Sequence, residues 1–388
     1  MMTLILLLIL IQLSDSYCAE LYEKMQSLYL KDLIMEPRNM GLEDATVLLN
    51  SVAIPFCIIA ALAPMLRVLV DYIGKKKVLL ISFILVISGA VICALTNNWL
   101  CFLLGSALVS FGCSVDIQYV YIVEDIKVDK RGTVRGVLAA VAALAGMLVA
   151  FVRNRSDNWR ILYLCGIIAV AVVIFITLIL LPKDTRKIEK KEKVKTVKKT
   201  PIKEILPYLL PLFVWGIGVA GATYYNEPIT SMTLKNEDDI QKVLLIQPVV
   251  TTLTTLVSGY LSDKFSRKKI IIADIVMALL GTIIFAVIGM SGAYNPILMG
   301  IGWGIMIGGY FGATNLMLLV VTENAPAERI GRVSALSAYF NGAGTGVGMV
   351  LISILGSFLG MELSKLLIIV PVVVITIIIL LSQKRKAS

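Results

Sequence analysis

The amino-acid sequence predicts an all-α membrane protein in which twelve transmembrane helices form two six-helix halves. The first observation is composition, because 58% of the 388 residues are hydrophobic and only 16% are charged, whereas soluble domains average about 45–50% apolar and about 25% charged residues. The second is the length of the apolar runs, since a helix needs about 20 apolar residues to cross a bilayer. The third is a charged sequence pattern that occurs once in each half of the chain.

Apolar runs separated by polar loops predict the spans and the division into halves. The stretch 183–204 holds ten Lys or Arg residues and four acidic residues, which is typical of a solvated linker. It separates a first half, 1–182, from a second half, 205–388. The spans are expected at 2–24, 45–66, 78–96, 98–122, 133–152, 159–181, 205–226, 240–261, 270–290, 294–321, 331–357 and 361–382.

The distribution of Lys and Arg predicts the orientation in the membrane. If the linker is cytoplasmic, 27 of the 36 cations lie in loops or tails on that side, which agrees with the positive-inside rule. Both termini are then cytoplasmic, as expected of a multi-pass protein of the cell membrane. The net charge of +10 could also indicate nucleic-acid binding, but that requires cations clustered on one polar face. Here they alternate with apolar runs, so a lipid bilayer and no nucleic acid is expected.

The first twenty residues allow two interpretations. A short apolar core followed by small residues is typical of a cleaved signal peptide. No Lys or Arg precedes that core, so we favour a first span that continues past Asp15 with a polar stripe.

Two charged patterns recur at nearly the same offset along the chain. The stretch "RVLVDYIGKKK" at 67–77 returns as "GYLSDKFSRKK" at 259–269, which places Asp71 and Asp263 192 positions apart. Glu124 in "YIVEDIKVDKRG" and Glu323 in "VVTENAPAERIGR" are 199 apart. Two parallel halves with a solute site between them near the midplane are a transporter architecture.

At these residues the sequence resembles the major facilitator superfamily, whose loop between the second and third spans carries Gly-x-Leu-x-Asp-x-x-Gly-Arg-Lys. In the family the leading Gly lets a neighbouring helix approach closely, and Arg67 stands in its place in the first copy. Ser266 stands where the second copy should have its second Gly. The matching residues are Leu69, Asp71, Gly74, Lys75 and Lys76 in the first copy, and Gly259, Leu261, Asp263, Arg267 and Lys268 in the second.

The second pattern resembles the sugar porters of that superfamily, which end the fourth span with Tyr-Ile-x-Glu and place Arg-Gly seven residues after the Glu. Lys127 replaces their usual Pro, and the paired Gln of their seventh span is missing. The agreement lies at Tyr121, Ile122, Glu124, Arg131 and Gly132, with a looser second copy at Glu323, Pro326 and Arg329.

These carboxylates and cations are expected to form a cytoplasmic gate. Charges at the inner ends of packed helices can pair across the two halves in one conformation and separate in the other. Each exposed pair contributes about 0–1 kcal/mol, so several together set a preference of a few kcal/mol. The alternative is that the charges serve only topology, for which cations alone would suffice. The gate candidates are Asp71, Gly74, Lys75, Lys76, Glu124, Arg131, Gly259, Asp263, Arg267, Lys268, Glu323 and Arg329.

The resemblance implies that the first, fourth, seventh and tenth spans line the solute cavity. A charged Asp inside a span costs about 2.5–3.5 kcal/mol on insertion scales, so Asp15 and Asp116 should face the interior and bind solute or protons. Alternatively, Asp15 is interfacial and Asp116 pairs with a nearby cation, while the aromatic candidates are core or belt residues. For Asp274 we expect snorkelling or local pairing. The other cavity-lining candidates are Gln12, Tyr22, Tyr119, Trp215, Tyr224, Tyr225, Asn226, Trp303, Tyr310 and Asn315.

The resemblance and the residue inventory together predict a secondary active transporter of a small organic solute, with a proton as coupling ion. The chain contains no His, so any proton relay must use carboxylates. Uptake of a sugar-like or other polar metabolite is favoured over drug or metabolite efflux, because the fifth span lacks the Pro of antiporters of this superfamily. A non-transporting receptor and a membrane-embedded enzyme are the alternatives from other classes. We expect no cofactor, no metal and a monomer.

Overall fold

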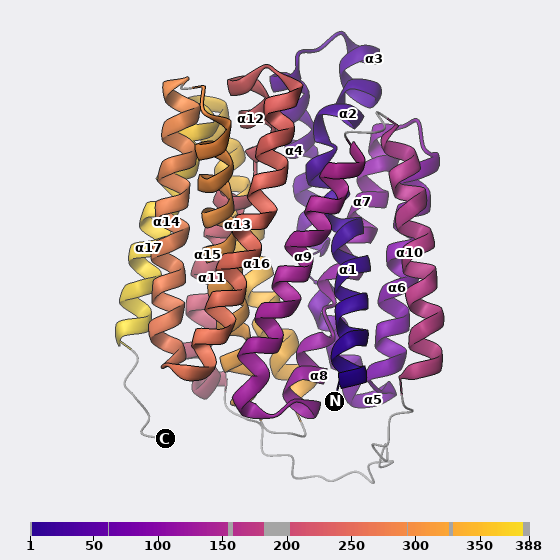
Figure 1. The fold of residues 1–388 in the computed structure, drawn as a ribbon, viewed down its shortest axis with the longest axis vertical. Helices are drawn as coiled ribbons and strands as arrows, with labels where there is room; N and C mark the ends of the chain where they lie inside the picture. Colours follow the sequence, from indigo (N-terminus) through magenta and orange to yellow (C-terminus); the bar gives the residue numbers. More distant parts are fainter. Residues whose placement is uncertain are drawn as a thin grey trace.

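The computed structural model describes residues 2–60, 62–153, 158–181, 202–292, 294–325 and 329–382. Within these ranges the protein is an array of roughly parallel helices without a strand (Figure 1). We refer to residues 2–181 as the N-terminal segment and to residues 202–382 as the C-terminal segment. In Figure 1 they occupy the right and left sides of the bundle. The predicted linker lies outside the described residues up to position 201.

The N-terminal segment contains ten α-helices and three short helical turns of other types within its described residues. The helices are α1 (Met2–Lys24), α2 (Gln26–Leu30), α3 (Glu36–Arg38), α4 (Leu42–Ala60), α5 (Val70–Ile73), α6 (Lys75–Leu95), α7 (Trp99–Ser114), α8 (Gln118–Asp125), α9 (Arg131–Arg153) and α10 (Trp159–Leu180). The turns are a π-helix, η1 (Lys31–Met35), and two 3₁₀-helices, η2 (Ala63–Leu69) and η3 (Val128–Lys130).

The C-terminal segment is built from longer, less interrupted helices. They are α11 (Ile202–Thr223), α12 (Asn226–Leu234), α13 (Glu237–Lys264), α14 (Arg267–Ser291), α15 (Pro296–Glu323), α16 (Ile330–Leu359) and α17 (Met361–Ser382).

Ten helical stretches in the described part of the chain are long and apolar enough to cross a membrane. They coincide with ten of the twelve expected spans. The two others are the second expected span, 45–66, and the seventh, 205–226. They correspond to the helices α4 and α11. The prediction of an all-α membrane fold is confirmed.

Some of the expected spans are not continuous helices, and the second, 45–66, is divided between α4 and η2. The fourth is interrupted between α7 and α8, where Asp116 has φ 33°, and the seventh ends at a break between α11 and α12, where Tyr225 has φ 61°. A positive φ is uncommon for residues other than glycine and often marks a functional position. In transporters, discontinuous helices typically surround the binding site. The stretches 31–44 and 227–239, expected as loops, are also largely helical.

Glycines allow the two segments to approach closely along α9 and α13. A Cβ atom on Gly136 would lie 2.9 Å from the Cα atom of Gly259, and one on Gly259 would lie 2.7 Å from the Cα atom of Gly136. Such contacts between small residues bring helix backbones together in membranes. Gly259, the first residue of the second motif copy, therefore lies where that motif is expected to permit close packing.

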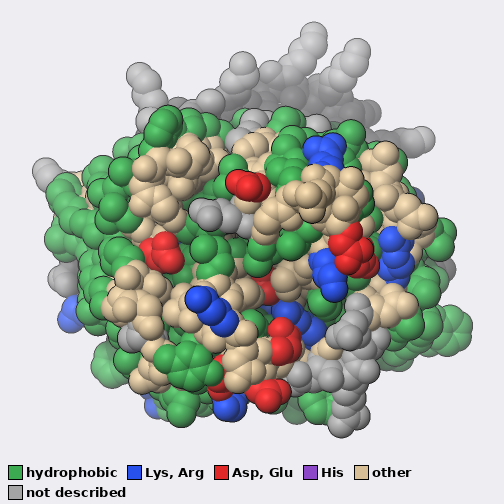
Figure 2. Space-filling model, turned by 90° about the horizontal axis from the view of Figure 1, so that it is seen from above, with side chains coloured by type: hydrophobic (Ala, Val, Ile, Leu, Met, Phe, Trp, Pro, Cys, Tyr) green, Lys and Arg blue, Asp and Glu red, His purple; other side chains and the backbone are tan. Residues whose placement is uncertain are grey.

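The two ends of the bundle differ from its sides. Figure 2 shows acidic and basic side chains across the middle of the upper face, with hydrophobic side chains around the rim. This arrangement suits a bundle that meets lipid along its sides and water at its ends. The first turn of α1 and the last turn of α17 both lie at the lower face (Figure 1), as an even number of spans requires.

Cysteine labelling should place the lower face in the cytoplasm. In a variant without the six native cysteines, single cysteines at Glu36 and Asp238, both exposed near the upper face, should react with a membrane-impermeant maleimide added to intact cells. A cysteine at Lys195 in the linker should react only after permeabilisation. Labelling of the linker in intact cells would contradict the predicted orientation.

Candidate functional site

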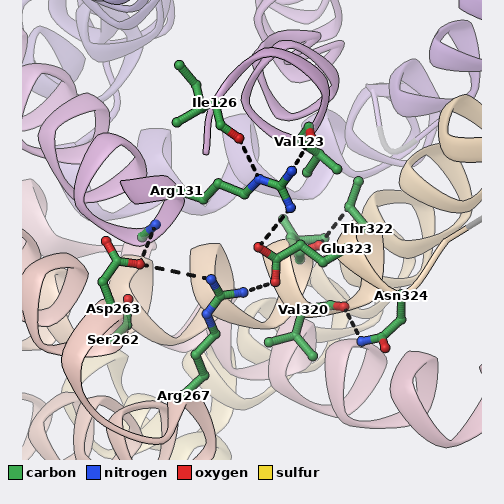
Figure 3. A network of polar contacts seen from close by, with 12 residues as sticks. Val123, Ile126, Arg131, Ser262, Asp263, Arg267, Val320, Thr322, Glu323 and Asn324 are labelled. Atoms are coloured by element: carbon green, nitrogen blue, oxygen red, sulfur yellow. Dashed lines mark hydrogen bonds and ion pairs between the residues drawn. The ribbon is translucent and has the colours of Figure 1, made fainter. Parts of the chain in front are cut away.

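Glu323, at the end of α15, joins the two segments at the lower face. Its carboxylate pairs with Arg131 of α9 at 3.4 Å and also with Arg267 of α14. Figure 3 shows the carboxylate between the two guanidinium groups, with Arg131 also donating to the carbonyl oxygens of Val123 and Ile126. Glu323 and Arg267 belong to the C-terminal segment and Arg131 to the N-terminal one, so this network fastens one segment to the other.

Asp263 makes a second connection between the N-terminal and C-terminal segments at the lower face, a boundary that we call the lower seam. Its carboxylate accepts hydrogen bonds from the backbone N–H of Gly132 at 2.9 Å and from Thr133, through N–H at 2.6 Å and Oγ1 at 2.7 Å. A carboxylate at the first turn of a helix is favoured by the free N–H groups and by the helix dipole. Asp263 thus caps α9 from the other segment, and Arg267 lies 3.9 Å from it.

The first copy of the motif is used differently. Asp71 is half-buried against the start of α16, where a Cβ on Gly331 would lie 2.7 Å from its Oδ1. Lys75 instead pairs within its own segment, with Glu124 at 3.0 Å and Asp125 at 2.8 Å. Lys76 donates to two carbonyl oxygens near the end of α10.

The remaining gate candidates lie at helix starts on the lower face. Gly74 has φ 89° and forms the turn into α6. Lys268 is half-buried in the first turn of α14, and Arg329 directly precedes α16. Pro326 lies outside the described residues.

A polar cluster lies further inside the bundle, at the break between α7 and α8. Asp116 pairs with Arg135 of α9 at 2.9 Å, so the alternative of an ion pair with a nearby cation applies. Arg135 also donates to Asn315 of α15 at 3.0 and 3.2 Å, and Tyr119 donates to the same oxygen at 2.8 Å. Three candidates, two from the fourth span and one from the tenth, therefore meet around Arg135, which the sequence did not single out.

Arg67 completes this cluster from the position where the family motif begins with Gly. Its guanidinium donates to the carbonyl oxygen of Val115 and to Ser334 of α16, at 3.0 Å to Oγ and 3.3 Å to O. Both Arg67 and Arg135 lie over the ring of Tyr119, at 5.5 and 4.0 Å from its centroid. Arg67 therefore fills the space that a Gly would leave for a close helix contact.

Asp15 lies on α1 near this cluster. It is half-buried, and its Oδ1 atom is buried without a hydrogen-bond partner among the described residues. Asp116 is its acidic neighbour, and Cys113 of α7 donates to its backbone oxygen at 3.3 Å. On the same helix, Gln12 bonds to Ser16 at 2.8 Å.

A cavity of about 160 Å³ opens one helical turn above Asp15. Residues of α1, α4, α7 and α10 surround it, and the C-terminal segment contributes Tyr224. Tyr22, also predicted, lies in its wall. The further lining residues include Cys18, Ala19, Phe56, Ser106, Ser110 and Tyr163.

The other aromatic candidates pack in the protein interior. Trp215 and Tyr310 stack with ring centroids 4.4 Å apart, and Tyr310 donates to the backbone oxygen of Trp215. Tyr225 is buried beside Gly356. None of these three lines the cavity, so core packing describes them in this conformation.

A buried polar network that the sequence did not indicate lies toward the upper face. Arg153 at the end of α9 pairs with Glu227 of α12 at 3.4 Å, and both side chains are almost fully buried. Lys24 of α1 donates to Gln247 of α13 at 2.6 Å and lies over the ring of Trp303 at 4.4 Å. These contacts also join the two segments.

Two further polar side chains are buried within the C-terminal segment. The side-chain oxygen of Asn226, a cavity candidate, accepts a bond from Lys365 of α17 at 2.6 Å. Asp274 of α14 is buried and accepts from Ser258 at 2.5 Å, so local pairing and not snorkelling applies. Among the described residues, no group of three His, Cys, Asp or Glu side chains could hold a metal ion.

Glu323→Gln should loosen the lower seam. Hydrogen bonds to charged groups contribute about 1.5–3 kcal/mol, so loss of this charge should expose the seam at least about tenfold more often. The readout is the rate at which a maleimide labels a cysteine at Ala139, which is buried between α9 and α13. Glu36→Gln, an exposed site away from the seam, is the matched control. An unchanged labelling rate would contradict the role of Glu323.

Asp263→Asn should reduce transport while expression stays near normal, because the amide adds no volume but turns an NH₂ group toward the donors of Thr133. Asp71→Asn should have a weaker effect, since Arg67 already connects that region to α16. Solute flux at matched protein levels in vesicles is the measurement. Unchanged flux in both variants would assign these residues to topology alone.

Comparison with known proteins agrees with this architecture. The model of the Major Facilitator Superfamily matches residues 25–348 and again 243–388. Over 133 residues the chain is 28% identical to the facilitated trehalose transporter Tret1 of Apis mellifera ligustica, a stretch that covers 34% of this chain and about a quarter (26%) of that transporter.

Solved structures share the fold over almost the whole chain. The human organic anion transporter MFSD10 (TETRAN) has a TM-score of 0.77 at 11% identity, covering 97% of this chain and 99% of that one. The proton:xylose symporter XylE has a TM-score of 0.77 at 14% identity, covering 97% and 94%. The chain is a multi-pass integral membrane protein that belongs to the Major Facilitator Superfamily of transporters.

Proposed function

We propose that this protein is a proton-coupled secondary transporter that takes up a small polar organic solute by alternating access. The observation that carries the proposal is a cavity lined by residues of both segments, together with two sets of contacts, one toward each face, that join the N-terminal and C-terminal segments. The lower set centres on Glu323 and Asp263, and the upper set on Glu227 and Gln247. Opening one set while the other stays closed would give the cavity access to one side at a time.

The two segments act in this proposal as the two halves of the transporter, joined by the linker 183–204. The lower face is cytoplasmic, in keeping with its cations, and the protein works as a monomer in the cell membrane. Several of the lower contacts are only partly buried, so each contributes modestly and water can replace it when the halves separate. Solute that binds one conformation better than the other shifts the balance between them.

Asp15 is the proposed proton site. Asp15 lies inside the first span, one helical turn below the cavity, and its Oδ1 atom is buried without a hydrogen-bond partner among the described residues. Ionisable side chains within spans are typical of proton relays. Asp116 differs, because Arg135 compensates its charge. Protonation of Asp15 before the cavity closes and release on the other side would link proton movement to solute movement.

The names of the similar proteins support a polar solute. The partial relative is described as a facilitated trehalose transporter, and one structural neighbour as a proton:xylose symporter. The cavity of about 160 Å³ offers hydroxyl groups from Ser106, Ser110 and three tyrosines, which suit hydrogen bonding to such a solute. Because Tyr22 and Tyr224 come from different segments, solute between them would contact both halves at once.

Asp15→Asn should abolish accumulation driven by a pH gradient but retain exchange of solute across the membrane. The amide mimics the neutral acid permanently, and exchange requires no net proton release. The measurement is uptake and counterflow of the same labelled solute in proteoliposomes, with and without a pH gradient. Glu36→Gln, the same type of carboxylate-to-amide change at an exposed position outside the cavity, serves as the control.

If the Asp15 variant accumulates solute with the wild-type dependence on the pH gradient, the proton assignment fails. Loss of both accumulation and exchange would show a role in the transport cycle itself and would equally count against a purely proton-coupling residue.

A further inference from the structure

Two arginines, Arg67 and Arg135, are buried in the bundle. The proposed proton pathway through Asp15 uses neither of them. Arg67 is 2% and Arg135 8% exposed. A guanidinium group stays charged in proteins, so oxygen atoms must surround it wherever it is buried. Arg135 is paired with the carboxylate of Asp116. The hydrogen-bond acceptors of Arg67 are neutral, namely the carbonyl oxygen of Val115 and the backbone and hydroxyl oxygens of Ser334.

Arg135 also retains unused donors. Its Nε and Nη2 atoms bond to Asn315 and Asp116, whereas Nη1 is buried without a hydrogen-bond partner among the described residues. A buried N–H group without an acceptor is rare and costly. Asn315 and Arg135 line a small cavity of about 10 Å³ between α9, α13 and α15, which is about the space that one water needs, so a solute group can reach these donors only when the segments separate.

We propose that Arg135 and Arg67 bind the anionic group of the transported solute, which makes the substrate a small organic acid. This inference rests on the transport function proposed above and specifies its substrate class. Guanidinium groups bind carboxylate and phosphate oxygens in bidentate fashion. Both arginines contact the same ring of Tyr119, so their positive charges lie near one another although they come from two elements, η2 and α9.

The contacts of these arginines across the seam suggest how an anion would enter. Asn315 and Ser334 belong to the C-terminal segment, while both arginines belong to the N-terminal segment. When the segments separate, these neutral acceptors are withdrawn and the guanidinium groups are left to an incoming oxyanion. Binding would then be tightest in one conformation, which is the condition for coupling solute to the conformational change.

The position of the cluster suits the lower end of the solute site. Ser110 of α7 lines the 160 Å³ cavity, and Asp116 follows it six residues later, just beyond the end of α7. Asp15 lies about one turn below Ala19, another wall residue. The acid group would therefore be held near Arg135 while the rest of the solute occupies the cavity above.

The ion pair of Arg135 and Asp116 could hold the helices together or could take part in anion binding. These two roles predict different effects when each residue is changed. If Arg135 binds the solute, Asp116 competes for the same guanidinium, so Asp116→Asn should tighten anion binding and Arg135→Gln should weaken it. If the pair only holds the helices together, both changes should act in the same direction. Arg135→Lys keeps the charge but loses the planar pair of donors, so an intermediate loss is expected.

The experiment is ligand binding to the purified full-length protein in detergent, followed by thermal stability and requiring no proton gradient. The probes are D-glucose, D-glucuronate and D-glucose 6-phosphate, which share a ring and differ in charge, and the pairs lactamide with lactate and benzamide with benzoate. We expect at least one acid to bind at least tenfold more tightly than its neutral counterpart. Glucuronate against glucose 6-phosphate distinguishes a carboxylate from a phosphate group.

The variants decide whether the preference arises at this cluster. Arg135→Gln and Arg67→Gln should each remove at least tenfold of the acid's affinity and leave the neutral compound unchanged, while Asp116→Asn should increase it. Arg38→Gln, an exposed arginine at the upper face, should behave as wild type. The double variant Arg135→Gln with Asp116→Asn removes both members of the ion pair, so neither is left as an unpaired charge, and it should lack the preference even where Arg135→Gln alone misfolds.

The proposal is overturned if no acid stabilises the protein, if acids and neutral counterparts bind equally, if Asp116→Asn and Arg135→Gln weaken binding alike, or if the double variant keeps the preference. Proton coupling is tested separately by Asp15→Asn. Acid binding without pH-driven accumulation would overturn only the proton assignment, and pH-driven accumulation of a neutral solute would overturn only the anion assignment.

Discussion

Charge inside a bundle that is surrounded by lipid must be compensated by the protein itself, and the arrangement of this molecule depends on that constraint. Polar and ionisable groups within spans face the bundle interior because exposure to hydrocarbon is expensive. Here much of the compensation crosses from one segment to the other. Glu323 pairs with Arg131, Asp263 with the first N–H groups of α9, and Glu227 with Arg153. The seam is thus held by polar contacts that can be exchanged.

The repeated motif illustrates how one sequence pattern can be used in two ways. In the second copy Asp263 binds the other segment directly. Arg267 does so indirectly, because it pairs with Glu323, which also pairs with Arg131. In the first copy Lys75 and Lys76 bind within their own segment, and Arg67, which replaces the expected Gly, makes the cross-contact to α16 instead. A motif that occurs twice in the chain therefore makes two different sets of contacts. The first copy carries an additional buried charge, that of Arg67.

The sequence predicts most of the fold but only part of the site. Apolar runs locate spans because hydropathy acts over about 20 residues, yet the positive φ values at Asp116 and Tyr225 leave no trace in hydropathy. Glu323 and Arg131 are both recognisable from the sequence motifs, whereas their pairing emerges only when α9 and α15 come together. Arg135 went unrecognised because it was counted among the loop cations that set topology.

Aromatic candidates show the same limit from another direction. The resemblance places Trp215 in a span that should line the cavity, but it does not predict which neighbour the ring meets. In the folded protein Trp215 stacks on Tyr310. Tyr119 lies fully buried under two arginines, and Tyr22 borders the open cavity. The difference among these rings is decided by which neighbouring helices pack against them, which is a tertiary property.

The upper and lower networks differ in a way that bears on how the two seams could alternate. The Arg153–Glu227 pair is almost fully buried, with side chains 3% and 0% exposed, whereas Arg131 and Glu323 are each 14% exposed. A buried pair carries a larger desolvation cost, and breaking it without replacement is unfavourable. A more exposed pair separates into water more readily. Under the proposed alternating access, opening of the upper seam would therefore cost more than opening of the lower seam, because other groups must take over the buried charges of Arg153 and Glu227. Arg153 also pairs with the exposed Glu237 of the C-terminal segment at 3.2 Å, so that contact has to be released in the same step.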